Sequence, residues 1–217
     1  MKKLDNVALA NTIIATLIQQ GHGDDYINAS HLMRTAYMLN IIYYLKYHQS
    51  ALKPEALQDY RIGIYGPYCD DIQNNFDPIA GLDEESTARQ LKNSLQEKFL
   101  FHKDNIFDVK VIPFDLNEID PTIRQIAKDY AEPLWIMSYL DLSDKFKAEP
   151  QMQNRNNQNY DVTYSFNQSI DWFSQAKNQF WITSNEQRKL ATEQEAEKIK
   201  NNPLINTEKL IQLLQEN

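Results

Sequence analysis

Apolar residues recur at helical spacing near the start of the chain. Asp5 is a residue type that favours a helix N-cap, and Gly21 stands where glycine commonly closes a helix. Between them, one helical face carries apolar side chains: Val7, Ala10, Ile14, Leu17 and Ile18. The pattern therefore predicts an amphipathic helix over residues 5–20.

A second helical pattern is apolar over much of its circumference. It begins after Asn28 or Ser30, either of which can cap a helix, and continues to about His48. Its apolar positions are Leu32, Ala36, Leu39 and Tyr43 in one stripe, with Tyr37, Tyr44 and Tyr47 beside it. A helix that is apolar on several sides is usually buried, so we expect this helix at the centre of the fold.

The rest of the chain predicts more helices and little β structure. Helical patterns cover 54–60, 69–76, 82–101, a stretch that starts at Pro121, 169–181 and the C-terminal residues. Short strands are expected within 105–114 and 160–166. The sequence therefore predicts a mainly α fold, a compact helical domain with a small β-hairpin or wing element.

The composition changes near residue 150. The stretch "QMQNRNNQN" is rich in Gln and Asn and poor in apolar residues, as linkers often are. We therefore expect a helical domain over 1–150, a linker over 151–159 and a helical C-terminal extension over 160–217. The extension contains four aromatic residues that can either complete the core or anchor a partner: Trp172, Phe173, Phe180 and Trp181.

The charge and the cysteine content limit the classes of function. The chain of 217 residues has a formal net charge of −8, of which the first 150 residues carry −7. An acidic chain is unsuited to broad nucleic-acid binding and suits a basic partner.

A single cysteine excludes an internal disulfide, and no apolar run is long enough to cross a membrane. We expect a cytoplasmic protein that has no membrane partner.

The sequence offers no recognisable catalytic or cofactor motif. The four histidines have no metal-ligand spacing: His22, His31, His48 and His102. Cys69 has no histidine nearby in sequence that could activate it, and phosphate-binding glycine motifs are absent. We therefore expect no enzyme activity, no metal and no cofactor.

The stretch "IGIYGPYCDDI" (62–72) combines turn residues with aromatic residues. Gly66 and Pro67 lie between Tyr65 and Tyr68, in a chain that has only 5 glycines. This pattern predicts a turn at Gly66-Pro67. Aromatic residues on loops often mark interfaces, so the turn is either a structural corner or part of a binding face.

Two segments in this order resemble the signatures of the Panacea domain family, also called SocA-like. The first is "INASHLMRTAYML", where Ile27, Leu32 and Tyr37 match a helix start followed by Leu-x-Lys-x-x-Tyr, with Arg34 in place of the lysine. The second is Tyr65-Gly66-Pro67. A later "LWIMSYLDLSDKF" is similar to the family's closing helix, and the resemblance covers about residues 5–150.

The resemblance implies a phage- or plasmid-associated antitoxin that binds and neutralises a cognate toxin protein. Some members of the family instead deliver their toxin to a protease. The resemblance also implies that Tyr37 packs near the Gly66-Pro67 turn. The partner-binding residues expected from the resemblance and from the aromatic cluster are Arg34, Tyr37, Tyr65, Gly66, Pro67, Tyr68, Trp172, Phe173 and Trp181.

An alternative function is a winged-helix-type DNA-binding regulator. The segment 82–114 carries five basic residues: Arg89, Lys92, Lys98, Lys103 and Lys110. Helical spacing places Arg89 and Lys92 on one face. The net charge of the chain counts against this alternative.

Overall fold

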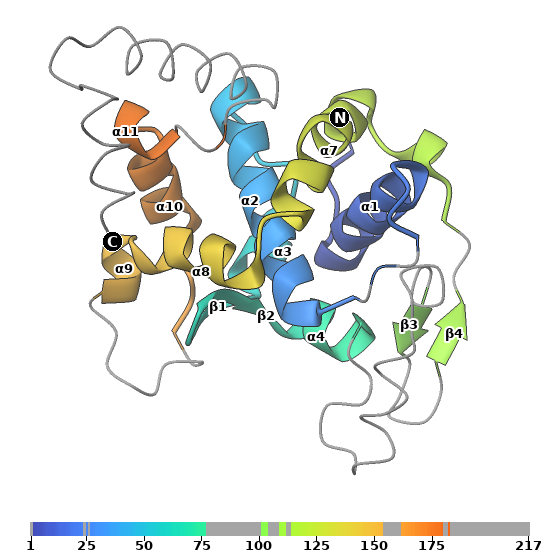
Figure 1. Ribbon diagram of the computed structural model, residues 1–217, viewed down its shortest axis with the longest axis horizontal. Coiled ribbons are helices and arrows are strands. Elements are labelled where there is room, and N and C mark those ends of the chain that lie inside the picture. Colours follow the sequence, from blue (N-terminus) through green and yellow to red (C-terminus); the bar gives the residue numbers. More distant parts are fainter. Residues whose placement is uncertain are drawn as a thin grey trace, which may run out of the picture. The chain divides into compact units, whose positions relative to one another are not determined.

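A long central helix, α2, organises the fold (Figure 1). The computed structural model describes residues 2–23, 25, 27–76, 114–153, 162–179 and 182, and the backbone of 101–103 and 109–111. The helices and strands are α1 (Asn6–Gln19), α2 (Ala29–Tyr47), α3 (Pro54–Gln58), β1 (Tyr60–Gly63), β2 (Gly66–Cys69), α4 (Asp70–Phe76), β3 (Phe101–Lys103), β4 (Val109–Val111), η1 (Leu116–Glu118), α7 (Pro121–Trp135), α8 (Tyr139–Lys147), α9 (Pro150–Gln153), α10 (Phe166–Phe173) and α11 (Ala176–Gln179).

The central position expected for α2 is confirmed. Every side chain from Ala29 to Tyr43 is buried except that of Ser30, which is half-buried. The helix contacts α1, α4, α7, α8, α10 and β2. The broad apolar cover read from the sequence therefore meets neighbours on all sides, which is why a helix of this composition stays in the interior.

The expected helix starts are also confirmed. The carboxylate of Asp5 accepts the Ala8 backbone N–H at 2.8 Å, and the amide oxygen of Asn28 accepts the His31 N–H at 3.2 Å. Gly21 follows the end of α1 with φ +97°, a conformation that glycine adopts without strain. These caps satisfy backbone groups that the helix ends leave open.

The mainly α fold with a small β element is confirmed, and the described residues form two antiparallel strand pairs. The pair β3–β4 overlaps the strand expected within 105–114. The pair β1–β2 is a hairpin that the sequence reading did not predict, in which Gly63 lies opposite Gly66. The loop therefore consists of Ile64 and Tyr65, and the turn predicted at Gly66-Pro67 is displaced by two residues.

The segment around Thr163 extends this hairpin. The Ile62 N–H donates to the Val162 carbonyl and the Tyr164 N–H donates to the Tyr60 carbonyl, both at 2.8 Å. Arg61 and Thr163 form an isolated antiparallel bridge. Residues 162–164 therefore lie along the free edge of β1, which accounts for the extended segment expected within 160–166.

The first compact unit of the chain extends to Asn178, beyond the domain boundary expected at residue 150. The first residues of the expected linker belong to α9, where Gln151 and Met152 are buried. Tyr164 and Phe173 are also buried in this unit, at 0% and 1% exposure. Tyr164 and Phe173 therefore complete the core of the first unit, because their apolar surface is removed from water there.

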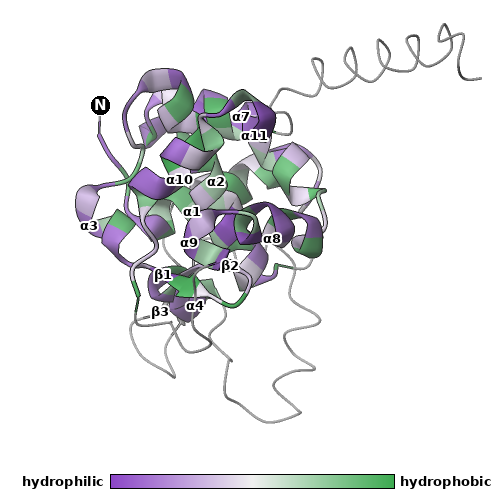
Figure 2. Cartoon of the chain, turned by 90° about the vertical axis from the view of Figure 1, so that its left-hand side faces the viewer, coloured by the Kyte–Doolittle hydropathy of each residue, from purple (hydrophilic) through white to green (hydrophobic). Residues whose placement is uncertain are grey.

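In Figure 2, which colours the ribbon by the hydropathy of each residue, α8 carries both hydrophilic and hydrophobic residues. The buried side of α8 consists of Leu142, Ser143 and Phe146. Among the helices of the described residues, none is long and apolar enough to cross a membrane.

Candidate protein-binding surface

The loop of the β1–β2 hairpin presents two large side chains to solvent. Ile64 is 51% exposed and Tyr65 is 41% exposed. Behind them, Gly66 has φ +123°, and a Cβ atom at this position would lie 2.9 Å from Cβ of Phe146. Only glycine fits this combination of backbone angle and close approach. Gly66 therefore lets the hairpin loop rest directly on α8.

Arg34 of α2 also holds the loop. Its Nε donates to the Tyr65 carbonyl at 2.8 Å, and its Nη1 donates to the Ser30 carbonyl one helical turn away. The guanidinium carbon also lies 4.8 Å from the centre of the Tyr139 ring. Because Arg34 is only 3% exposed, these contacts are shielded from water and position both Tyr65 and Tyr139.

The two tyrosine rings meet between the hairpin and α8. The centres of the Tyr65 and Tyr139 rings are 5.8 Å apart in an edge-to-face arrangement. The Lys147 ammonium lies 5.3 Å from the centre of the Tyr65 ring. Leu140, next to Tyr139, is 59% exposed. We call the set Ile64, Tyr65, Tyr139 and Leu140 the tip surface.

Arg34, Tyr65 and Gly66, which the sequence placed in a binding face, do lie together. The expected proximity of Tyr37 to the hairpin is confirmed: its ring centre is 5.9 Å from that of Phe146, and Phe146 lies against Gly66. Tyr37 itself is fully buried and Pro67 is buried, so neither side chain is available to a partner. Tyr68 is half-buried.

The aromatic residues expected to anchor a partner from the C-terminal extension do not form one exposed cluster. Phe173 is buried, with its ring centre 6.0 Å from that of Phe146. Trp172 is half-buried, and the Lys177 ammonium lies 5.8 Å from its ring centre. Trp181 lies outside the described residues. Phe173 is therefore a core residue of the first unit, and this corrects its assignment as a partner contact.

A buried carboxyl group, which the sequence reading missed, lies beneath the hairpin region. Glu149 is 0% exposed. Its Oε2 accepts hydrogen bonds from Gln151 Nε2 at 2.7 Å and Ser169 Oγ at 2.8 Å, and its Oε1 accepts one from the Tyr164 hydroxyl at 3.1 Å. Tyr37 reaches the same group through Ser169, at 3.3 Å between the two hydroxyl oxygens. We call Glu149, Gln151, Tyr164 and Ser169 the buried carboxyl network.

Burial raises the pKa of Glu149 from 4.5 to about 7, because removal from water disfavours the charged form more than the three hydrogen bonds favour it. The network links the end of α8 to α10 and thereby fixes 162–173 to the core. In sequence, Glu149 borders a stretch that resembles a linker, and no local pattern marks it as buried.

Cys69, His31 and His22 have surroundings unlike those of a reactive thiol or a metal site. Cys69 is fully buried, and this burial raises the pKa of its thiol to about 12. His31 stacks on Trp135, with ring centres 4.6 Å apart. His22 lies 2.9 Å from Asp25 and 3.2 Å from Glu132. In the part of the chain that the structure describes, no group of three or more His, Cys, Asp or Glu side chains is arranged to hold a metal ion.

The DNA-binding alternative depends on five basic residues whose side chains the structure does not describe. Arg89, Lys92 and Lys98 lie within 77–100, which the structure does not describe. Lys103 and Lys110 lie on the paired strands β3 and β4, of which only the backbone is described.

Comparisons with protein-family models, with curated proteins and with solved structures gave no match to this chain.

Proposed function

We propose that this protein is a cytoplasmic antitoxin that binds a cognate toxin protein through the tip surface and acts without catalysis. The observation that supports this proposal is the exposed pair Ile64 and Tyr65 on a loop that is held rigidly by Arg34. Protein interfaces are enriched in tyrosine and arginine, and a few such residues usually supply most of the binding energy.

The structure of the loop favours binding over a purely structural role. A surface loop that only connects two strands needs no large exposed side chains, whereas this one exposes Ile64 and Tyr65 and lies beside Tyr139. Because Arg34 and Gly66 already fix the loop, little conformational entropy is lost when a partner binds. The tip surface is therefore already ordered before a partner binds.

The charge of the chain indicates the chemistry of the partner. With a net charge of −8, the protein attracts a basic protein and accelerates their encounter at low salt. Neutralisation then occurs by occlusion of the toxin. Delivery of the bound toxin to a protease is a second way in which the same surface can serve the same role.

The proposal is tested by co-expression with the gene encoded beside this one, where the resemblance places the toxin. The wild-type protein is expected to restore growth that the neighbouring gene arrests. Ile64→Asp and Leu140→Asp each place an unpaired charge in the interface and are expected to weaken toxin binding by about 30-fold or more and to abolish rescue. Gln168→Asp is the matched control, because it adds the same charge at an exposed position on α10.

Circular dichroism and thermal melting of each variant confirm that it is folded. If the wild-type protein neither binds the neighbouring product nor restores growth, the antitoxin function is wrong. If folded Ile64→Asp and Leu140→Asp variants still rescue growth, the toxin binds elsewhere.

A further inference from the structure

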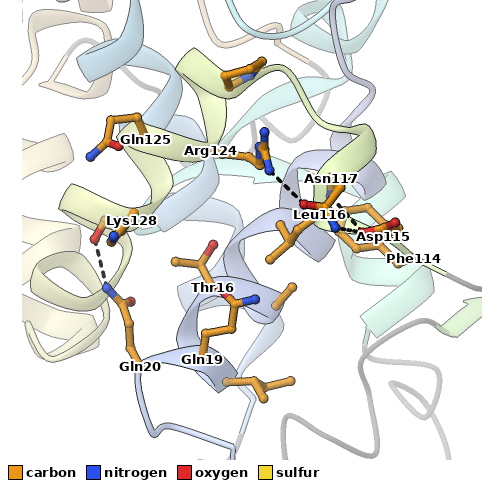
Figure 3. Close-up of a pocket in the computed structure, with 13 residues that line it drawn as sticks. Thr16, Gln19, Gln20, Phe114, Asp115, Leu116, Asn117, Arg124, Gln125 and Lys128 are labelled. Atoms are coloured by element: carbon orange, nitrogen blue, oxygen red, sulfur yellow. Dashed lines mark hydrogen bonds between the residues drawn. The ribbon is translucent and has the colours of Figure 1, made fainter.

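Two side chains at the end of α1 link it to α7. The first link is neutral: Gln20 Nε2 donates to the backbone carbonyl of Lys128 at 2.9 Å, in the cleft that Figure 3 shows between the two helices. The second is made by His22, whose Nε2 lies 3.2 Å from Oε1 of Glu132. Lys128 and Glu132 are about one helical turn apart on α7, so the two links act at neighbouring points of that helix.

His22 is held between two carboxylates. Its Nδ1 lies 2.9 Å from Oδ2 of Asp25, and its Nε2 faces Glu132. An ionised carboxylate only accepts hydrogen bonds, and a histidine ring donates from both nitrogens only when it is protonated. The neutral ring donates from one nitrogen and directs a lone pair at the second carboxylate. Both contacts can therefore be hydrogen bonds at the same time only in the charged form of His22.

Asp25 has a second donor that keeps it in place. The indole Nε1 of Trp135 donates to the same Oδ2 atom at 3.1 Å. Trp135 is 8% exposed and stacks on His31 with the ring planes 5° apart, so packing fixes its position. The neutral ring of His22 therefore keeps its proton on Nδ1, toward the nearer and better-held carboxylate. The contact between Nε2 and Glu132 is the one that is lost.

The surroundings of His22 favour its charged form. In the described part of the chain, the charges that act on it are those of Asp25 and Glu132. Burial lowers the pKa of the imidazole, but the hydrogen bonds and charges of the two carboxylates outweigh it and raise the pKa above the ordinary value of 6.5. Burial lowers the pKa of His31, so this nearby histidine is uncharged at neutral pH. The change of charge in this cluster therefore belongs to His22.

We infer that His22 is a proton-controlled clamp, which joins the segment after α1 to α7 when it is protonated and releases Glu132 when it is neutral. Because the clamp raises the pKa of His22 in the folded protein, its contribution to stability is complete below pH 6.5 and is lost as the pH rises through the folded-state value. The link between Gln20 and Lys128 has no titratable group and is kept at every pH. The clamp contains no residue of the tip surface.

Nitrogen-15 NMR of the histidine rings in the full-length protein tests the protonation of His22. His22→Gln identifies the His22 signals by their absence. We expect His22 to titrate above pH 6.5 and to keep its proton on Nδ1 once it is neutral. Glu132→Gln removes one of the two charges and is expected to lower the pKa of His22. Glu55→Gln, the same change on the exposed surface of α3, is the control and is expected to leave that pKa unchanged.

Hydrogen exchange tests the release. The measured quantity is the protection factor of the His22 backbone N–H, which donates to the Leu17 carbonyl at 2.9 Å. Between pH 6 and pH 8.5 it is expected to fall by about two- to fivefold, the size of effect that a partly exposed ion pair supplies, and to stay constant in Glu132→Gln. The Gln20 backbone N–H, bonded to the Thr16 carbonyl at 3.0 Å, is the internal reference.

Three results would each overturn the clamp. His22 titrates at or below pH 6.5, its pKa is as high in Glu132→Gln as in the wild type, or the protection of its N–H changes with pH no more than that of Gln20. None of these measurements involves the toxin, so they can fail or succeed whatever the tip surface binds.

Discussion

Replacing Glu149 by Gln is expected to remove the pH dependence that this buried carboxyl imposes on stability. The wild-type group has a pKa of about 7 in the folded protein and an ordinary value of 4.5. Below pH 4.5 it is protonated in both the folded and unfolded states. As the pH rises from 4.5 through 7, only the folded state retains the proton, so the free energy of unfolding decreases.

The size of the effect follows from the two pKa values. Each pKa unit corresponds to about 1.4 kcal/mol, so ionisation of Glu149 destabilises the folded protein by about 3 kcal/mol above pH 7. Glutamine has nearly the same shape and no charge. Its amide oxygen can still accept from Gln151 and Ser169, while its amide N–H can donate to the Tyr164 oxygen. Compared with the protonated carboxyl, the glutamine is therefore expected to lower the free energy of unfolding by about one hydrogen bond, roughly 1 kcal/mol. This cost does not depend on pH.

The measurement is the difference in free energy of unfolding between Glu149→Gln and wild type, by urea denaturation at pH 4.5 and at pH 8.5. This difference is expected to shift by about 3 kcal/mol in favour of the variant at the higher pH. Glu55→Gln, the same carboxyl-to-amide change on the exposed surface of α3, is the control. If the shift for Glu149→Gln is no larger than that of the control, the carboxylate is solvated in the folded protein and the reasoning is refuted.

Three further predictions concern the hairpin, the cysteine and the chain boundary. Gly66→Ala is expected to lower stability by roughly 2–3 kcal/mol more than Gly21→Ala, since both need a positive φ but only Gly66 faces Phe146; comparable losses in urea denaturation would contradict this. Cys69 is expected to react with iodoacetamide only when the protein unfolds, because its thiol is buried and its pKa is raised to about 12; rapid labelling in native buffer would show that it is accessible. A truncated chain of residues 1–178 is expected to fold cooperatively. A chain of residues 1–160 lacks the buried Tyr164, Phe166 and Phe173, whose burial contributes about 1.5–3 kcal/mol each, and is expected not to fold. Thermal melting of the two chains distinguishes these outcomes.

The helices near the N-terminus could be predicted because their determinants are local. Asp5 and Asn28 cap helices through backbone groups three residues away, and the apolar spacing fixes the buried face. The β1–β2 hairpin was missed because its two-residue loop, Ile64-Tyr65, lacks the Asn-Gly type of sequence that marks such turns. Its glycines lie outside the loop, so the sequence points to a turn two residues too late.

The buried carboxyl network could not be predicted, since most of its contacts join residues that are far apart in the sequence. Glu149 lies 15 residues from Tyr164 and 20 from Ser169, and Ser169 lies 132 residues from Tyr37. The sequence around it is polar, and polarity alone predicts an exposed linker. Gln151 donates a hydrogen bond to Glu149 in the interior, and hydrogen bonds of this kind make the burial of such polar residues possible.

The tip surface and the buried carboxyl network share one support. Arg34 and Tyr37 are about one turn apart on α2, with Arg34 bonded to the hairpin loop and Tyr37 directed to Ser169. Phe146 lies under Gly66 and also contacts Tyr37, so its ring joins the two regions. A change at Phe146 or Tyr37 therefore disturbs the core and the loop together, and loss of binding in such a variant says nothing about which residues touch the partner. Only exposed side chains such as Ile64 and Leu140 separate binding from folding, because their replacement leaves this shared support intact.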